Sequence, residues 1–77
     1  MAAHNPKDQK AIDKLGATIR FKRVERGLTI VRLAELCEVE YTTISKIERG
    51  LVNTTISMIV IIARALKIPP SQLLTDC

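Results

Sequence analysis

The stretch TIVRLAELCEVEYTTISKIERG, residues 29–50, decides the fold of this chain. Its first part predicts a short helix capped by Thr29, because a threonine hydroxyl can accept a backbone N–H of the first turn. Apolar residues follow at helical spacing. We expect this helix to bury Leu33, Ala34 and Cys37. A break at Glu38 and Val39 ends it and starts a tight turn.

A second short helix follows the turn, from about Glu40 to Arg49. Its apolar residues Ile44 and Ile47 are three positions apart and therefore lie on one inward face. Gly50 ends the helix, since glycine readily adopts the left-handed conformation found at helix C-termini. Two short helices joined in this way have the dimensions of a helix-turn-helix, whose second helix can enter the major groove of DNA.

One longer helix is predicted before this pair. It begins in the sequence Asn5-Pro6-Lys7-Asp8, with Asn5 as its cap, Pro6 at its first position and Asp8 in its first turn. Gly27 ends it. Its inward residues are Ile12, Leu15 and Ile19.

After residues 29–50, Thr55 can cap a fourth helix, and Pro69-Pro70 stops it. Its inward residues are expected to be Ile56, Ile59, Ile62, Ala63 and Leu66. A last turn or two, from Ser71 to about Thr75, buries Leu73. No strand pattern occurs, so the expected fold class is all-α, a compact bundle of five helices.

Length and cysteine content limit what kind of domain this can be. The 77 residues suffice for one domain, which we place over residues 6–77 after a polar leader at residues 1–5. A domain this small buries only about 60% of its unfolded surface and is commonly reinforced by disulfides, a metal or self-association. Cys37 and Cys77 form no C-x-x-C pair, and the only histidine, His4, lies in the leader. We expect no metal, no cofactor and reduced thiols, which leaves self-association.

The net charge of +4 and the isoelectric point near 9.4 favour an anionic partner without distinguishing DNA, RNA and membrane. Residues 1–10 are polar and resemble no signal peptide. The apolar stretch Ile56–Leu66 is interrupted by Ser57 and Arg64 and is shorter than the roughly 20 residues that span a bilayer. We therefore expect no membrane contact and a cytoplasmic location.

Nothing in the sequence resembles a nucleophile elbow, a phosphate-binding loop or a metal site, so no enzyme is expected.

Several co-linear motifs carry a family resemblance. They are LGxxIRxxR at residues 15–23, RGLT at 26–29, LAE at 33–35, TISKIERG at 43–50, and AxALxI at 63–68 with Leu73-Leu74 after it. Together they resemble the lambda-repressor-like (XRE) helix-turn-helix family over about residues 12–74. The resemblance implies a bacterial or phage-encoded transcription regulator that binds double-stranded DNA through a helix-turn-helix at about residues 29–49.

The resemblance also implies roles for single residues. Arg23 and Glu48 match a largely buried ion pair between the first and third helices. The positions that reach base edges from the recognition helix are matched by Tyr41, Thr42 and Lys46, assisted by Thr43 or Glu40. A lysine can reach the O6/N7 edge of guanine, and a threonine can contact a thymine methyl. Glu40 is either a helix cap or an acceptor for a cytosine amino group.

Arg49 and Asn53 match positions that contact the DNA backbone. Arg20, Lys22 and Arg26 add positive charge on the first helix, and only one or two of them need touch a phosphate.

Ile30 and Glu38 depart from the family pattern. The family usually has glutamine where this chain has Ile30, so the phosphate contact of that glutamine is lost or supplied by Thr29 or Arg32. Glu38 stands where glycine is common, so we expect a left-handed conformation there that costs roughly 1 kcal/mol.

The fourth helix is apolar nearly all round, because Met58, Ile61 and Ala65 lie outside its inward face. With Leu74 of the last turn they form a candidate homodimer interface. The sequence thus predicts a homodimeric regulator on a pseudo-palindromic operator, of the phage-repressor or the restriction–modification controller type. The alternative is an antitoxin that regulates its own gene through the same domain and neutralises a toxin with another surface.

Overall fold

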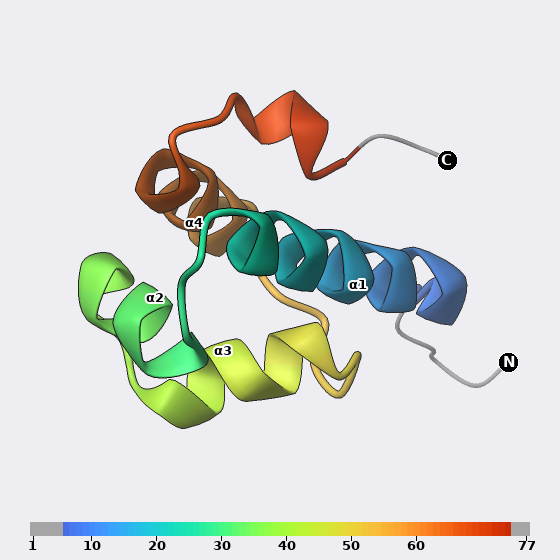
Figure 1. Ribbon diagram of the computed structural model, residues 1–77. Coiled ribbons are helices and arrows are strands. Elements are labelled where there is room, and N and C mark those ends of the chain that lie inside the picture. Colours follow the sequence, from blue (N-terminus) through green and yellow to red (C-terminus); the bar gives the residue numbers. More distant parts are fainter. Residues whose placement is uncertain (1–5, 75–77) are drawn as a thin grey trace, which may run out of the picture.

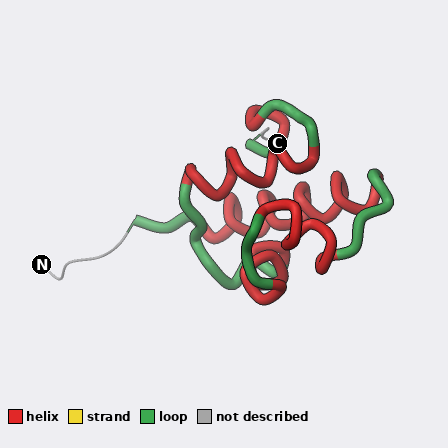
Figure 2. The backbone as a smooth tube through the Cα atoms, turned by 90° about the vertical axis from the view of Figure 1, so that its left-hand side faces the viewer, coloured by secondary structure: helices red, strands yellow, loops and turns green. Residues whose placement is uncertain are grey.

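The computed structural model describes residues 6–74, and within them the chain is all-helical, as the sequence predicts. The elements are α1 Gln9–Glu25, α2 Ile30–Cys37, α3 Tyr41–Glu48, α4 Ile56–Leu66 and the 3-10 turn η1 Pro70–Gln72. Figure 1 shows α1 between the α2–α3 pair below it and α4 with η1 above it. The side view in Figure 2 shows helices joined by loops. The predicted count of five helices was approximate, because the last one is a three-residue 3-10 turn.

Side-chain caps fix where three of the helices begin. The hydroxyls of Thr29 and Thr55 accept the backbone N–H groups of Arg32 and Met58 at 3.0 and 3.1 Å, which confirms both predicted caps. The first helix, however, begins later than predicted: Pro6 lies before it, and the Asp8 carboxylate caps it by accepting the N–H of Ala11. Asn5 lies outside the described residues. An earlier start would add a turn without an apolar residue to bury, so packing would not stabilise it.

The core lies where the four α-helices and η1 meet. Its fully buried side chains are Ile19, Leu33, Ile44, Ile62, Leu66 and Leu73. The predicted inward residues are buried except for Leu15, which is half-buried, and Ile56, which is 68% exposed. Ile56 is the first residue of α4 and lies about 70° around the helix from the mean direction of its buried residues. Its assignment to the inward face was wrong.

Gly16 allows α1 to pack closely against the end of α3. A Cβ atom at this position would collide with the carbonyl oxygen of Ile47 and stand only 2.7 Å from that of Glu48. Because glycine has no Cβ, α1 can lie directly against the last turn of the recognition helix. The glycine in the first of the sequence motifs therefore positions α3.

Candidate nucleic-acid interface

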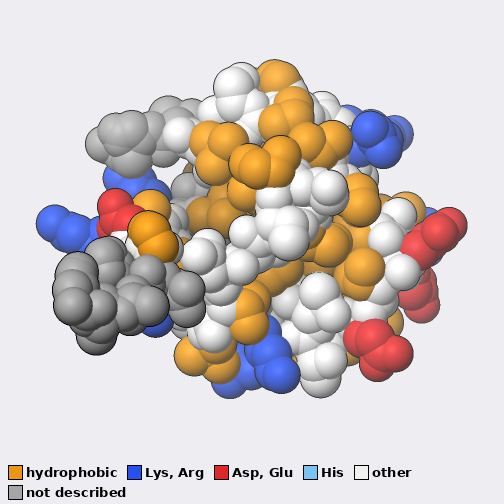
Figure 3. All heavy atoms as spheres, turned by 180° about the vertical axis from the view of Figure 1, so that it is seen from behind, with side chains coloured by type: hydrophobic (Ala, Val, Ile, Leu, Met, Phe, Trp, Pro, Cys, Tyr) orange, Lys and Arg blue, Asp and Glu red, His pale blue; other side chains and the backbone are white. Residues whose placement is uncertain are grey.

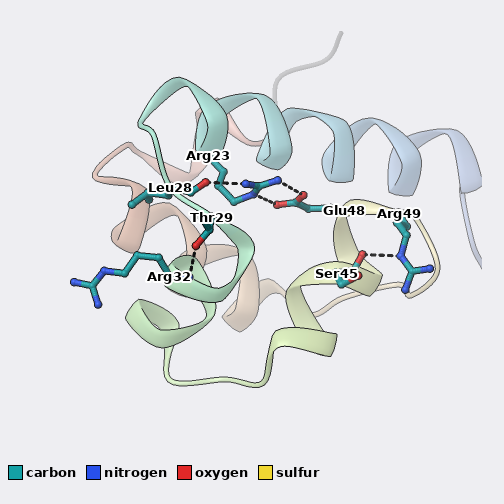
Figure 4. A network of polar contacts seen from close by, with 7 residues as sticks. All are labelled: Arg23, Leu28, Thr29, Arg32, Ser45, Glu48 and Arg49. Carbon is teal, nitrogen blue, oxygen red and sulfur yellow. Dashed lines mark hydrogen bonds and ion pairs between the residues drawn. The ribbon is translucent and has the colours of Figure 1, made fainter.

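A buried ion pair joins α1 to α3. Arg23 donates from Nε to Glu48 Oε2 at 2.7 Å and from Nη2 to Oε1 at 3.0 Å, and its Nη1 donates to the carbonyl oxygen of Leu28 at 2.7 Å. The side chains of Arg23 and Glu48 are only 9% and 4% exposed. Figure 4 shows the guanidinium between these two acceptors. The paired, parallel hydrogen bonds fix the end of α3 relative to α1 and to the segment before α2.

A further hydrogen bond, which was not predicted, joins the first turn of α1 to Gly50, shortly after the end of α3. The Gln9 amide donates from Nε2 to Asp13 Oδ1 and to the carbonyl oxygen of Gly50, both at 2.9 Å. Gly50 has a φ of +71°, and the Asp13 carboxylate occupies the space that a Cβ would need there. The first turn of α1 thus holds the point where the chain leaves the recognition helix. No local sequence signal marks a contact between residues 41 positions apart.

The outward face of α3 is polar and open to solvent. It carries Tyr41, Thr42, Lys46 and, just after the helix, Arg49, all exposed, while Thr43 is half-buried. Glu40 occupies the N-cap position, but its side chain makes no capping hydrogen bond. Glu40 is thus the N-cap residue of α3 by position, without a capping bond from its carboxylate, and its contact to a cytosine amino group stays a prediction.

A surface hollow lies along one edge of this face. It is lined by Arg20, Ile30, Tyr41, Ser45, Glu48 and Arg49. Arg49 Nε donates to the carbonyl oxygen of Ser45 at 3.4 Å, so its guanidinium lies against its own helix (Figure 4). Ser45 is buried and was not among the predicted site residues. The hollow brings Arg20 of α1 together with Arg49 of the α3 end.

The remaining predicted cations do not converge on this hollow. Lys22 is two positions from Arg20 and so lies on nearly the opposite side of α1. Arg26 pairs with Glu25 at 3.3 Å, and Arg32 pairs with Glu35 at 3.2 Å. Figure 4 shows Arg32 pointing away from Ser45 and Arg49. Asn53 is exposed in the loop after α3.

The outer face of α4 differs from that of α3 because it is apolar. Met58, Ile61 and Ala65 are half-buried against the core, and Leu74 is 54% exposed. Ile61 and Ala65 also line a hollow whose α2 wall includes Leu36, an exposed apolar residue. Figure 3 shows hydrophobic side chains gathered on the side opposite to that of Figure 1, at the level of α4 and η1.

Cys37 lies at the edge of that hollow and is buried. Burial disfavours the thiolate and raises the pKa of the Cys37 thiol. Within residues 6–74, no helix is both long and apolar enough to span a bilayer, and no group of three metal-ligating side chains of the His, Cys, Asp or Glu type occurs.

Comparisons with known proteins agree with this architecture. Residues 19–73 match the helix-turn-helix family model HTH_3. The restriction-modification controller protein C.AhdI from Aeromonas hydrophila is 32% identical, with a TM-score of 0.79 over 80% of this chain and 94% of that one. A mutant of the controller protein C.Esp1396I is 30% identical, with a TM-score of 0.77 over 82% of this chain and 80% of that one.

A third solved structure is that of SinR, described as the master regulator for biofilm formation, in complex with DNA. It is 31% identical, with a TM-score of 0.75 over 79% of this chain and 98% of that one. Among curated protein sequences there is no significant match.

Proposed function

The chain belongs to the XRE-type helix-turn-helix family of DNA-binding regulators, and from this premise we propose that it binds a specific operator by placing α3 in the major groove. The observation that carries the proposal is the contrast between the two sides of α3. Its inner side is fixed by Ile44, Ile47 and the buried Glu48, whereas its outer side is polar and exposed. A similar protein, SinR, was solved with DNA.

The proposed role of each residue follows from where it lies on the surface of α3 and beside it. Tyr41, Thr42 and Lys46 contact base edges, with Thr43 and Glu40 beside them at the start of the helix. Arg49, Asn53 and Arg20 contact phosphates, which position the protein without reading sequence. Arg20 is favoured over Lys22, because Arg20 shares a hollow with Tyr41 and Arg49.

We further propose that the protein acts as a homodimer through α4. Met58, Ile61 and Ala65, together with Leu74, present more apolar surface than the other helices cover. A second copy related by a two-fold axis would cover this face, and its recognition helix would lie about 34 Å away in the next major groove. The operator is then pseudo-palindromic. This function requires neither catalysis nor a cofactor. We place the protein in the bacterial cytoplasm.

A titration against DNA at several salt concentrations tests the proposal. A dimer with about 6–10 phosphate contacts should lose affinity with a log–log salt slope of about −5 to −9. Genome-wide footprinting supplies the operator, and random duplex of the same length serves as the control. A slope near zero on the footprinted site would overturn the proposed function.

A further inference from the structure

The side of α1 that faces away from the core carries a regular stripe. It consists of Lys10, Lys14, Ala17, Phe21 and Val24, spaced four, three, four and three positions apart. At about 100° per residue these positions fall within about 80° of one another on the helix surface. All five are exposed, and the chain's only phenylalanine, Phe21, is 63% exposed. We call this set the α1 stripe.

Nothing in residues 6–74 covers the α1 stripe, because α1 packs against α3 and α4 with its other side. A single exposed apolar side chain needs no explanation. Here three exposed apolar residues, Ala17, Phe21 and Val24, lie next to one another at the four- and three-residue spacing found where two paired helices contact each other. Phe21, Val24 and Ala17 also line a hollow with Arg20 and Glu48. Arg20 and Glu48 line the candidate DNA-contacting hollow as well, so the stripe continues from that surface.

The charges along α1 make the stripe complementary to itself. The N-terminal half of the stripe is basic, through Lys10 and Lys14. Its C-terminal half is apolar and is flanked by Arg20 on one side and by Glu25 on the other, and the exposed Glu25 carboxylate pairs with Arg26. Neither lysine forms an ion pair within the described part of the chain. Two copies laid antiparallel therefore bring the basic half of one against the apolar half and Glu25 of the other.

We propose that the α1 stripe pairs antiparallel with the α1 stripe of a second copy and so links two dimers on DNA. Helix geometry fixes the register: Ala17 faces Ala17, where the small side chains allow close approach. Phe21 then lies against the methylene chains of Lys10 and Lys14 from the other copy. A lysine can bury these methylene groups on an apolar surface while its ammonium group stays in water. Lys10 then lies one residue along the axis from the level of Glu25, and the flanking Asp13 lies one residue from the level of Arg20. Arg20 is itself level with Lys14, but the two side chains lie on opposite flanks of the paired helices.

The same symmetry is compatible with DNA binding. In an antiparallel helix pair the two-fold axis is perpendicular to the helices, so equivalent flanks of the two copies face the same way. Arg20 flanks the stripe and lines the candidate DNA-contacting hollow, so both copies would present that hollow to one duplex. The stripe lies opposite the side of α1 that packs on α3 and α4, and it includes none of the residues proposed for the dimer face. The contact is small and partly ionic, so it is weak alone and appears as cooperativity on DNA.

Cooperativity on random-sequence duplex tests this inference, which rests on the proposed DNA binding. A 20-base-pair duplex accepts one dimer, whereas a 60-base-pair duplex accepts several. We expect neighbouring dimers on the long duplex to bind more tightly than isolated ones by a factor within the usual range of about 5–150. Phe21→Ser should bring that factor close to one without changing affinity for the short duplex. The control Val31→Ser removes another exposed apolar residue, which belongs to α2 and is 51% exposed, and should leave the factor unchanged.

A charge swap separates pairing from a general effect on α1. Glu25→Lys should reduce the cooperativity factor, because it places a lysine within one residue of the level of Lys10 of the other copy. Lys10→Glu combined with Glu25→Lys keeps the net charge and should restore the factor. Binding of both duplexes without cooperativity, or cooperativity that survives Phe21→Ser, would overturn the α1 contact while DNA binding stands. Binding of neither duplex would overturn the proposed function and this inference with it.

Discussion

The helices α3 and α4 are built alike on their inner sides and differently on their outer sides. Each buries isoleucines at helical spacing, Ile44 and Ile47 in α3 and Ile59 and Ile62 in α4. Away from the core, α3 carries exposed polar residues, and α4 carries half-buried apolar ones. The inner faces explain why the chain folds, and the outer faces indicate what each helix meets. A polar face can exchange water for DNA, whereas an apolar face is stabilised by another protein surface.

The two helices use different residues for the same kind of C-terminal end. At each end there is a left-handed residue, and the N–H of the residue after it closes the last turn. Leu51 N–H donates to the carbonyl oxygen of Lys46, and Ile68 N–H donates to that of Ala63. In α3 the left-handed residue is Gly50, and in α4 it is Lys67, with a φ of 62°. Glycine is required in α3 because Asp13 fills the Cβ position. At Lys67 the strain is local, so the requirement is weaker.

The largest expected effect concerns the inner side of α3. Glu48→Gln leaves the buried Arg23 without its carboxylate partner and should lower the free energy of unfolding by about 3–5 kcal/mol. Urea denaturation measures this. The control is Glu35→Gln, which breaks an exposed pair with side chains 57% and 60% accessible and should cost less than about 1 kcal/mol. Equal costs for the two variants would show that the Arg23–Glu48 pair does not hold α3 in place.

The next effect concerns the outer side of α4. Ile61→Glu should place a charge in the proposed dimer face, yield a monomer by sedimentation, and remove about half of the specific binding free energy, roughly 2–5 kcal/mol. Ile56→Glu is the matched control, because Ile56 belongs to the same helix but is exposed away from that face.

Circular dichroism must show that Ile61→Glu remains helical, and Met58→Glu serves as a second variant if it does not. Dimers that persist in a folded variant of either kind would place the interface elsewhere.

A smaller effect separates two functions on the outer side of α3. Lys46→Ala should cost about 1–3 kcal/mol on the operator and little on random DNA. Arg49→Ala should weaken binding to both sequences alike and make the salt slope shallower. Parallel titrations on the two duplexes measure the difference. Identical behaviour of the two variants would remove the proposed division between base and phosphate contacts.

Local signals in the sequence were enough to predict most of the fold. Thr29, Thr55 and the inward isoleucines act through neighbours three or four positions away, so their roles follow from spacing. The start of α1 was mispredicted because Asn5 followed by Pro6 and the later Asp8 are both acceptable helix starts, and the structure uses the Asp8 cap. The Arg23–Glu48 pair followed from the resemblance. The contact of Gln9 with Gly50 could not be predicted, because it depends on how α1 and α3 pack.

The smallest expected effect returns to the two helix ends. Lys67→Gly should raise the free energy of unfolding by up to about 1 kcal/mol, because glycine adopts the left-handed conformation without the steric cost that a side chain incurs. The gain is limited, since glycine also makes the unfolded chain more flexible. Gly50→Ala should act in the opposite direction and more strongly, because it combines a left-handed conformation with a collision against Asp13. Thermal and urea unfolding of both variants measure the pair. If Lys67→Gly destabilises the protein as Gly50→Ala does, then Lys67 contributes a contact that outweighs its backbone strain, and the two helix ends are less different than their φ angles suggest.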